Sequence, residues 1–358
     1  MSHSVPILII GAGLAGCLLA WRLEQRGLSC QLIGCAKRPN ASEVAAGVIN
    51  PVTGRWMTKT WRIDTLLPEA ESLYRQLESR FGVTLYHPTP LFRYCQNSSD
   101  AKRLGRRMRN PRYSNVLGSF IPPGDGPDAI LDAHGSFQIL HTAYVDLPLL
   151  LKTLRQHFGA RGQYRDEDFA YNDLKPAATS DHEWSYRNQT FGHVIFCEGA
   201  GILNNPWFGE LPLTPAKGET LLLESPTLDL PRAIYHHRKW ILPYGDQTFR
   251  IGATFDETDL TEQPTEQGHA ELFEAARAFI APQHALHLRQ QLAGIRPCTV
   301  DSRPLIGTHP TKPGLHVFNG LGSKGASLAP AMSRHFLGYL LDGAPLDPEV
   351  GIARFNHI

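Results

Sequence analysis

The sequence lacks the spacing patterns by which cysteine and histidine form disulfide frameworks or bind metals. Its six cysteines, at positions 17, 30, 35, 95, 197 and 298, are scattered and form no C-x-x-C pair. Its sixteen histidines include no H-x-x-x-H or H-E-x-x-H spacing. We therefore predict no metal site and no disulfide scaffold, a pattern typical of proteins from a reducing cytosol.

Long apolar segments and an excess of charge of one sign are also absent. The apolar run near the N-terminus is interrupted by three glycines and has no basic segment before it. We therefore expect neither a signal peptide nor a membrane span, and a cytoplasmic location. The formal net charge of +1 gives no global reason to expect nucleic acid or a membrane as a partner. What remains is a chain of 358 residues, 42% hydrophobic and 19% charged, the profile of a globular protein of about two domains.

The first forty residues contain the clearest motif. The segment PILIIG, residues 6–11, is a short apolar run typical of a buried parallel strand. It leads into GAGLAG, which places Gly11, Gly13 and Gly16 in G-x-G-x-x-G spacing before a predicted helix and a second strand. Such glycines allow a tight turn, close approach to a pyrophosphate and close packing of the helix. We predict that they bind a dinucleotide together with Leu14 and Ala15; a purely structural strand–helix–strand unit is the alternative.

One feature of a dinucleotide site is missing. A carboxylate normally follows the second strand and accepts a hydrogen bond from a ribose hydroxyl, but Gly34 takes this place. Lys37 and Arg38 follow it closely. They suit the ribose phosphate of NADP, or they belong to a solvated turn. The motif alone leaves the choice of dinucleotide open.

The order of strand and helix signals indicates the fold class. Strands, helices and glycine turns gather at both ends of the sequence and around residues 145–200, with antiparallel-looking strands between them. This order favours an α/β fold in which an antiparallel-sheet substrate domain is inserted into a Rossmann-like domain. We predict the Rossmann-like domain at residues 1–85, 144–214 and 292–358, and the substrate domain at residues 86–143 and 215–291.

Further motifs follow GAGLAG along nearly the whole chain. They are ASEVAAG (41–47), YVDLPLLLKTL (144–154), VIFCEGAG (194–201), FRIGATFD (249–256), GIRPCTVDSRPLIG (294–307) and NGLGSKGASLAPAMS (319–333). In this order they resemble the D-amino-acid oxidase / glycine oxidase family of FAD-dependent amine oxidoreductases. The form GLGSKG also resembles the oxidase half of the bifunctional enzyme that modifies tRNA wobble uridines and removes a carboxymethyl group from an amine.

The resemblance implies a non-covalently bound FAD in a domain of the glutathione-reductase type, with its adenosine at GAGLAG. FAD has no ribose phosphate, so Lys37 and Arg38 are not needed for one. The missing carboxylate at Gly34 predicts a loss of about 1.5–3 kcal/mol in FAD binding. Cys298 does not align with the cysteine that links the flavin in some relatives. The other FAD-binding residues that the resemblance implies are Ser42, Ala46, Gly47, Gly199, Gly320, Gly322, Ser323, Lys324 and Gly325.

Four side chains are candidates for the chemistry at the substrate end. Arg296, in GIRP, can hold a substrate carboxylate in a planar, bidentate fork; the alternative is an ion pair with Asp301. Tyr244 offers a hydroxyl to the same carboxylate or a wall to the pocket, unless it is a core tyrosine. Lys324 and Lys59 are cations that could approach the flavin, and the alternative for both is a solvated surface position.

We predict an oxidase or dehydrogenase that transfers a hydride to FAD from a small amino acid or secondary amine with a carboxylate. The resulting imine hydrolyses, and the electron acceptor is oxygen or an unidentified compound. One alternative is a tRNA-modifying oxidoreductase, which a basic cluster favours and the near-neutral net charge opposes. A solvated helix face also explains this cluster, which comprises Lys102, Arg103, Arg106, Arg107, Arg109 and Arg112. A further alternative is a flavin- or NAD(P)-binding protein without turnover.

Overall fold

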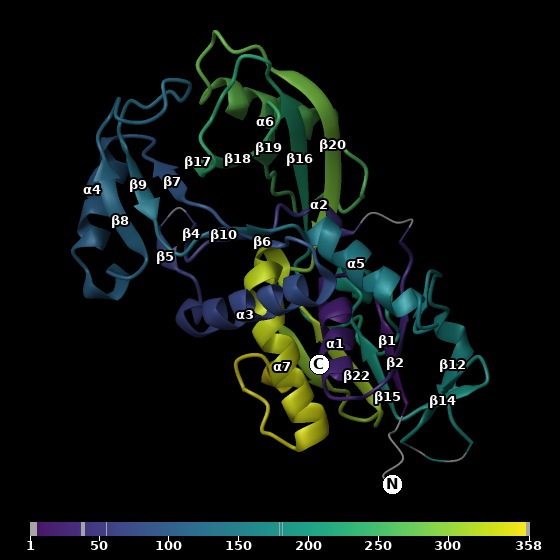
Figure 1. Ribbon diagram of the computed structural model, residues 1–358. Coiled ribbons are helices and arrows are strands. Elements are labelled where there is room, and N and C mark those ends of the chain that lie inside the picture. The colour runs from purple at the N-terminus through teal and green to yellow at the C-terminus, as the bar shows by residue number, and fades with distance from the viewer. Residues whose placement is uncertain (1–5, 37–39, 55, 179, 181, 356–358) are drawn as a thin grey trace.

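The computed structural model describes residues 6–36, 40–54, 56–178, 180 and 182–355; the predicted Lys37 and Arg38 turn lies outside them. A six-stranded sheet has the strand order β11-β2-β1-β15-β22-β21 (Figure 1). Its neighbouring strands are parallel except β21, which runs antiparallel to β22. The strands are β1 (Ile7–Ile10), β2 (Cys30–Ile33), β11 (Tyr164–Arg165), β15 (His193–Phe196), β21 (Leu305–Thr308) and β22 (Leu315–Asn319).

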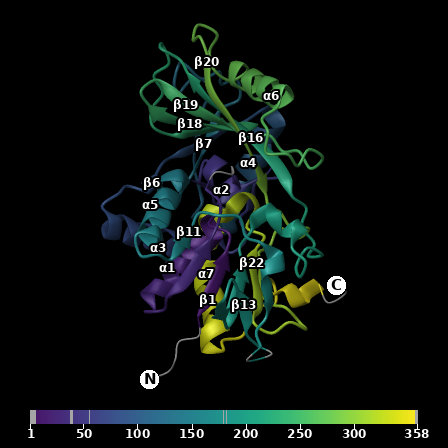
Figure 2. The ribbon, with the colours of Figure 1, turned by 90° about the vertical axis from the view of Figure 1, so that its right-hand side faces the viewer.

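This sheet is buried on both faces, as the apolar run of β1 predicts. Ile7 and Ile9 face a core formed with four helices, and Leu8 and Ile10 face a second core under a small antiparallel sheet. Figure 2 shows α3 and α5 on one side of the sheet and β13 on the other. The helices are α1 (Leu14–Gln25), α3 (Ile63–Phe81), α5 (Leu147–Gly159) and α7 (Gly325–Asp342), and the small sheet has β12 (Leu174–Pro176), β13 (Trp184–Tyr186) and β14 (Gln189–Phe191).

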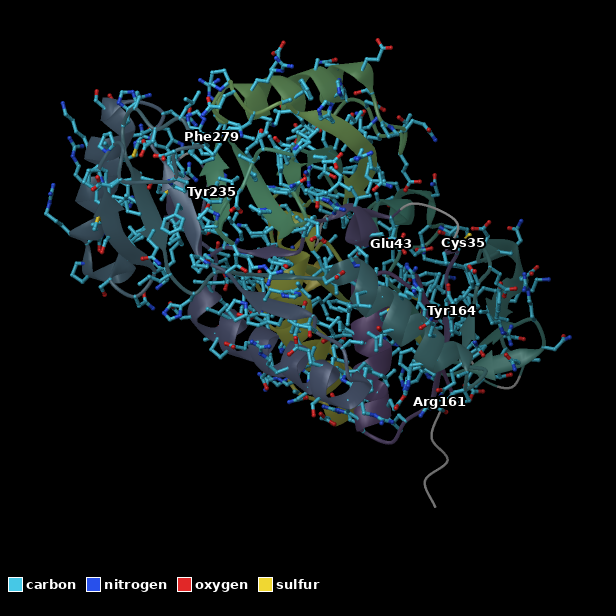
Figure 3. The ribbon with its side chains drawn as sticks, turned by 45° about the horizontal axis from the view of Figure 1, so that its top comes forward. Cys35, Glu43, Arg161, Tyr164, Tyr235 and Phe279 are labelled. Atoms are coloured by element: carbon cyan, nitrogen blue, oxygen red, sulfur yellow. The ribbon has the colours of Figure 1, made fainter. Side chains whose placement is uncertain are left out.

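An eight-stranded sheet, in the order β20-β16-β19-β18-β17-β7-β9-β8, forms the upper part of Figure 1. All its neighbours are antiparallel except β17 and β7. One face packs against α6 (Glu266–Arg277) through a core that includes Tyr235 and Phe279, labelled in Figure 3. The opposite face packs in part against α4 (Ser98–Met108). The strands are β7 (Leu91–Tyr94), β8 (Leu117–Ile121), β9 (Ser136–Ile139), β16 (Ala216–Glu224), β17 (Ile234–His237), β18 (Lys239–Gly245), β19 (Thr248–Gly252) and β20 (His287–Arg296).

Short elements connect the two sheets. β3 (Val48–Ile49), β10 (Ala143–Val145) and β6 (Tyr86–Pro88) form an antiparallel sheet, and β4 (Val52–Thr53) pairs with β5 (Thr58–Lys59). The segment after residue 40 begins with the short helix α2 (Ala41–Val44). The reason is local: the Asn40 side chain caps this helix by accepting hydrogen bonds from the backbone N–H groups of Ser42 and Glu43.

The described residues form neither a membrane-spanning helix nor a cluster of metal ligands. Within the described residues, none of the helices combines the length and the apolar character needed to cross a membrane. The same part of the chain contains no group of three or more His, Cys, Asp or Glu side chains that could hold a metal ion. The cysteines are free thiols.

Candidate active site

A cavity of about 460 Å³ lies between the two sheets, at the carboxyl ends of β1, β2 and β15. The ends of β16 and β20 close it from the eight-stranded sheet, through residues such as Gly218 and Arg296. The cavity therefore brings together segments from both ends of the sequence, from Gly11 to Ala326. The predicted cofactor residues that line it are Gly11, Gly13, Leu14, Ala15, Ser42, Ala46, Gly47, Gly199, Gly322, Ser323 and Gly325.

Three predicted cofactor residues are not in the cavity lining. A Cβ atom at Gly16 would lie 1.9 Å from the carbonyl oxygen of Gly11, so this glycine lets α1 pack against the turn. Gly320 has a φ of +71°, and a Cβ there would lie 2.9 Å from the backbone nitrogen of Leu305. Lys324 begins the turn into α7, and burial lowers the pKa of its ammonium group. Gly16 and Gly320 thus allow the close backbone packing of the two turns, while neighbouring residues of these turns line the cavity.

The glycine turn after β1 is fixed by side chains from distant segments. Gly11 has a φ of +102°, and a Cβ atom there would lie 2.3 Å from the carbonyl oxygen of Cys197. The Ser42 hydroxyl accepts a hydrogen bond of 3.1 Å from the backbone N–H of Leu14. From α5, Arg155 donates Nε and Nη2 to the Ala12 carbonyl oxygen at 3.0 and 2.8 Å. Arg155 was not predicted, because no local pattern links residue 155 to residue 12.

The starts of α1 and α7 line the cavity. α1 begins after Gly13 and α7 begins after Lys324; neither of these residues caps its helix with a side chain, and neither helix has an acidic residue in its first turn. At the start of α1, the Leu14 N–H donates to the Ser42 hydroxyl. The first backbone N–H groups of a helix have no partner within the helix, and they attract negative charge. This arrangement suits the pyrophosphate of a dinucleotide at α1 and an anionic ring at α7.

At the substrate end, Arg296 lies on β20 and lines the cavity. Nη1 donates to the Lys217 carbonyl oxygen at 3.2 Å, and Nη2 donates to the Thr254 carbonyl oxygen at 3.1 Å. The alternative of an ion pair with Asp301 is wrong, because that carboxylate pairs with Arg354 at 2.8 Å. Burial lowers the pKa of Arg296, from a value so high that the group stays charged at neutral pH.

Two other candidates for the chemistry, Tyr244 and Lys59, are not among the lining residues. Tyr244 lies on β18 and packs against the core; its ring is 6.3 Å from that of Tyr144, and burial raises its pKa. Lys59 lies on β5, where its ammonium group pairs with Asp64 at 2.8 Å and donates to the carbonyl oxygen of Arg112. Lys59 thus lies outside the cavity lining, and its approach to the flavin stays a prediction.

A partly buried carboxyl that the sequence did not reveal lies beside the first glycine turn. Glu198 follows β15 and lines the cavity. The Tyr171 hydroxyl donates to its Oε1 at 2.6 Å, and the Asn205 amide donates to its Oε2 at 2.8 Å. Burial nevertheless raises the pKa of Glu198 to about 7. Asn205 follows Glu198 by seven residues, but Tyr171 precedes it by 27 residues and belongs to another segment, so no spacing in the sequence predicts this network.

A sheet of this type, with glycine turns around one cavity, defines a dinucleotide-binding protein. The sequence profile of the family described as FAD dependent oxidoreductase matches residues 6–337, which is most of the chain. The chain therefore belongs to this FAD-dependent oxidoreductase family. Membership in this family favours FAD over NADP as the dinucleotide at the first glycine motif. The cavity fits a dinucleotide, because the turns at Gly11 and Gly13 bring bare backbone to its wall.

Individual relatives are similar but distant. The chain is 25% identical over 354 residues to the tRNA 5-methylaminomethyl-2-thiouridine biosynthesis bifunctional protein MnmC of Marinobacter nauticus, covering 92% of this chain and 54% of that protein. The chain spans about half the length of the first curated relatives that it matches. Among solved structures, glycine oxidase from Geobacillus kaustophilus aligns with a TM-score of 0.80, 20% identity and coverage of 96% and 97%. Iminodiacetate oxidase from Chelativorans aligns with a TM-score of 0.78, 22% identity and coverage of 96% and 99%.

Proposed function

We propose that this chain oxidises the C–N bond of a small amino acid or secondary amine that carries a carboxylate, giving an imine that hydrolyses. The observation that carries the proposal is the Arg296 guanidinium. Arg296 lines the cavity and, among the described residues, its guanidinium forms no ion pair with an acidic side chain; its two hydrogen bonds go to backbone carbonyl oxygens. A cation in this position selects an anionic group on the substrate, and a carboxylate matches its planar fork.

The residues of the chain bind and orient the substrate. Two N–H groups of Arg296 donate to backbone carbonyl oxygens, which leaves three of its five for a carboxylate. Thr220, Trp240 and Ala253 line the same cavity and form a wall against the substrate. A bound FAD supplies the hydride acceptor, so the chain itself needs little acid–base chemistry. The names of two structural neighbours, glycine oxidase and iminodiacetate oxidase, support a small amine with a carboxylate.

An anaerobic substrate screen tests this function. The purified protein is supplied with FAD and mixed with glycine, sarcosine, iminodiacetate, proline and D-amino acids, and the flavin absorbance is followed. We expect at least one carboxylate-bearing amine to bleach the flavin, and addition of oxygen or an artificial acceptor to restore its colour. If dithionite bleaches the bound flavin but none of these amines does, the proposal is rejected and a role without turnover on such amines is favoured. Acid precipitation should release the FAD, since we propose a non-covalent cofactor.

A second candidate function is oxidation of a modified base in tRNA. Trp56 is 62% exposed, and the Arg103 guanidinium lies 5.0 Å from its ring centre. RNA-binding proteins stack unpaired bases on exposed aromatic rings beside basic groups. The similarity to MnmC supports the same candidate. A filter-binding assay in rising salt tests it: we expect salt-sensitive tRNA binding that Trp56→Ala and Arg106→Ala weaken, and the absence of such binding would reject it.

A further inference from the structure

The missing ribose carboxylate has a structural reason. Gly34 directly follows β2, and a Cβ atom there would lie 2.6 Å from the backbone nitrogen of Ala12 and 2.7 Å from its Cβ. Ala12 cannot move away easily, because Arg155 holds its carbonyl oxygen through two N–H groups. The usual position is therefore closed to an acidic side chain, and a carboxylate for the ribose has to come from another segment.

The loop after β11 lies against the end of β2. β11 pairs with β2 in parallel, and the Tyr164 hydroxyl donates to the Gly34 carbonyl oxygen at 2.9 Å. The backbone N–H of Gly34 donates to the Arg165 carbonyl oxygen at 3.1 Å. One residue further along, Asp166 accepts a hydrogen bond of 2.7 Å from the backbone N–H of Ala36. Figure 3 labels Tyr164 and Cys35 in this part of the molecule.

Asp168, two residues beyond Asp166, lines the same cavity as Gly34 and Cys35. Two other acidic residues line that cavity within the described part of the chain, Glu198 and Glu262. Glu198 follows β15, which lies on the far side of β1 from β2, and both of its oxygens already accept hydrogen bonds. Glu262 belongs to the loop between β19 and α6 of the other sheet. Asp168 is thus the acidic lining residue that the strand next to β2 presents.

We propose that Asp168 accepts the hydrogen bonds of the adenosine ribose hydroxyls of FAD, in place of the carboxylate that Gly34 excludes. This inference rests on the proposed function, because it needs FAD with its adenosine at the first glycine turn. The side chain is exposed in the free chain and lies at the cavity rim. It also interacts within the chain, so its replacement has to be separated from an effect on folding.

A comparison of FAD with an analogue that lacks the adenosine ribose hydroxyls tests the proposal. Dissociation constants are measured by flavin fluorescence quenching for the wild-type chain, Asp168→Asn and the control Glu167→Gln. Glu167 is the matched control, because its carboxylate pairs with Arg187 at 2.8 Å. We expect Asp168→Asn to weaken FAD binding about 10-fold, the lower end of the range for a charged hydrogen bond, because the rim is open to water. Glu167→Gln should bind FAD as the wild type does.

The analogue makes each outcome decisive. The wild type and Glu167→Gln should bind the analogue about 10-fold more weakly than FAD, and Asp168→Asn should bind both alike. Equal binding of FAD and the analogue by the wild type would overturn the proposal without any variant. Discrimination by Asp168→Asn as strong as that of the wild type would overturn it as well. Failure of the wild type to bind FAD at all is a different result, which rejects the proposed function itself.

Discussion

Replacement of Arg296 by methionine, which keeps an unbranched apolar stem but removes the guanidinium, tests the substrate end most directly. The guanidinium has three N–H groups that its two backbone contacts leave for a substrate. A carboxylate held by two of them should gain about 3 kcal/mol, the lower end for two charged hydrogen bonds. We therefore expect kcat/KM for carboxylate-bearing amines to fall about 100-fold or more.

The assay compares two substrates in two proteins. The first substrate is the best amino acid from the screen and the second is its methyl ester, which has no anionic group. Arg296→Met should lower kcat/KM for the acid and change that for the ester little. FAD affinity and melting temperature are measured in parallel, because the variant also leaves the carbonyl oxygens of Lys217 and Thr254 without a donor.

Two results would refute this reasoning. If kcat/KM falls equally for the acid and the ester, Arg296 supports the cavity wall and does not hold a carboxylate. If neither value changes, the substrate does not contact Arg296. Arg296→Lys refines the test, since a point charge without the planar fork should recover only part of the lost activity.

Glu198, Ser42 and Tyr244 each allow a further test of the site. Burial raises the pKa of Glu198 to about 7, above its ordinary value of 4.5. Its contribution to stability is therefore fully present below pH 4.5 and is lost as pH rises through 7. In urea titrations of the FAD-free chain, we expect the unfolding free energy to fall between pH 5 and 8 by on the order of 3 kcal/mol. Glu198→Gln should flatten that dependence, and an unchanged slope would show that another group causes it. Ser42→Ala removes the acceptor for the backbone N–H of Leu14. It should lower the unfolding free energy by about 1 kcal/mol and weaken FAD binding. Equal unfolding free energies and FAD affinities for the wild type and the variant would contradict a role of Ser42 in holding the first glycine turn. Tyr244→Phe should change kcat/KM by less than about threefold, because its hydroxyl is not in the cavity lining, and a large loss would instead restore the predicted contact with the substrate carboxylate.

Local signals in the sequence predicted the parts of the fold that depend on neighbouring residues. The strand, glycine turn and helix over residues 7–25 are formed as expected, because turn glycines and apolar runs act within a few residues. The prediction of an α/β fold with a Rossmann-like sheet and a second, mostly antiparallel sheet is confirmed. The domain boundaries at residues 85, 143, 214 and 291 stay a prediction.

Side-chain networks could not be predicted, because they join residues that only the fold brings together. Arg155 contacts Ala12 across 143 positions, and Glu198 is held by Tyr171 from a separate loop. Arg296 was found from its resemblance to a family motif, but its contacts with Lys217 and Thr254 depend on the pairing of β16 with β19 and β20. The sequence thus indicated which residues to consider, and the fold decided which of them meet.

The substrate end depends on a close approach that only glycine permits. Gly218 lies on β16 beneath Arg296, and a Cβ atom there would lie 2.0 Å from Nη2 of the guanidinium. With no side chain in the way, the guanidinium lies against the strand, where the carbonyl oxygens of Lys217 and Thr254 fix its orientation. A largely buried cation without an acidic partner is unfavourable in the free chain. We propose that a bound carboxylate offsets this cost, and that the same oriented charge discriminates against amines that lack one.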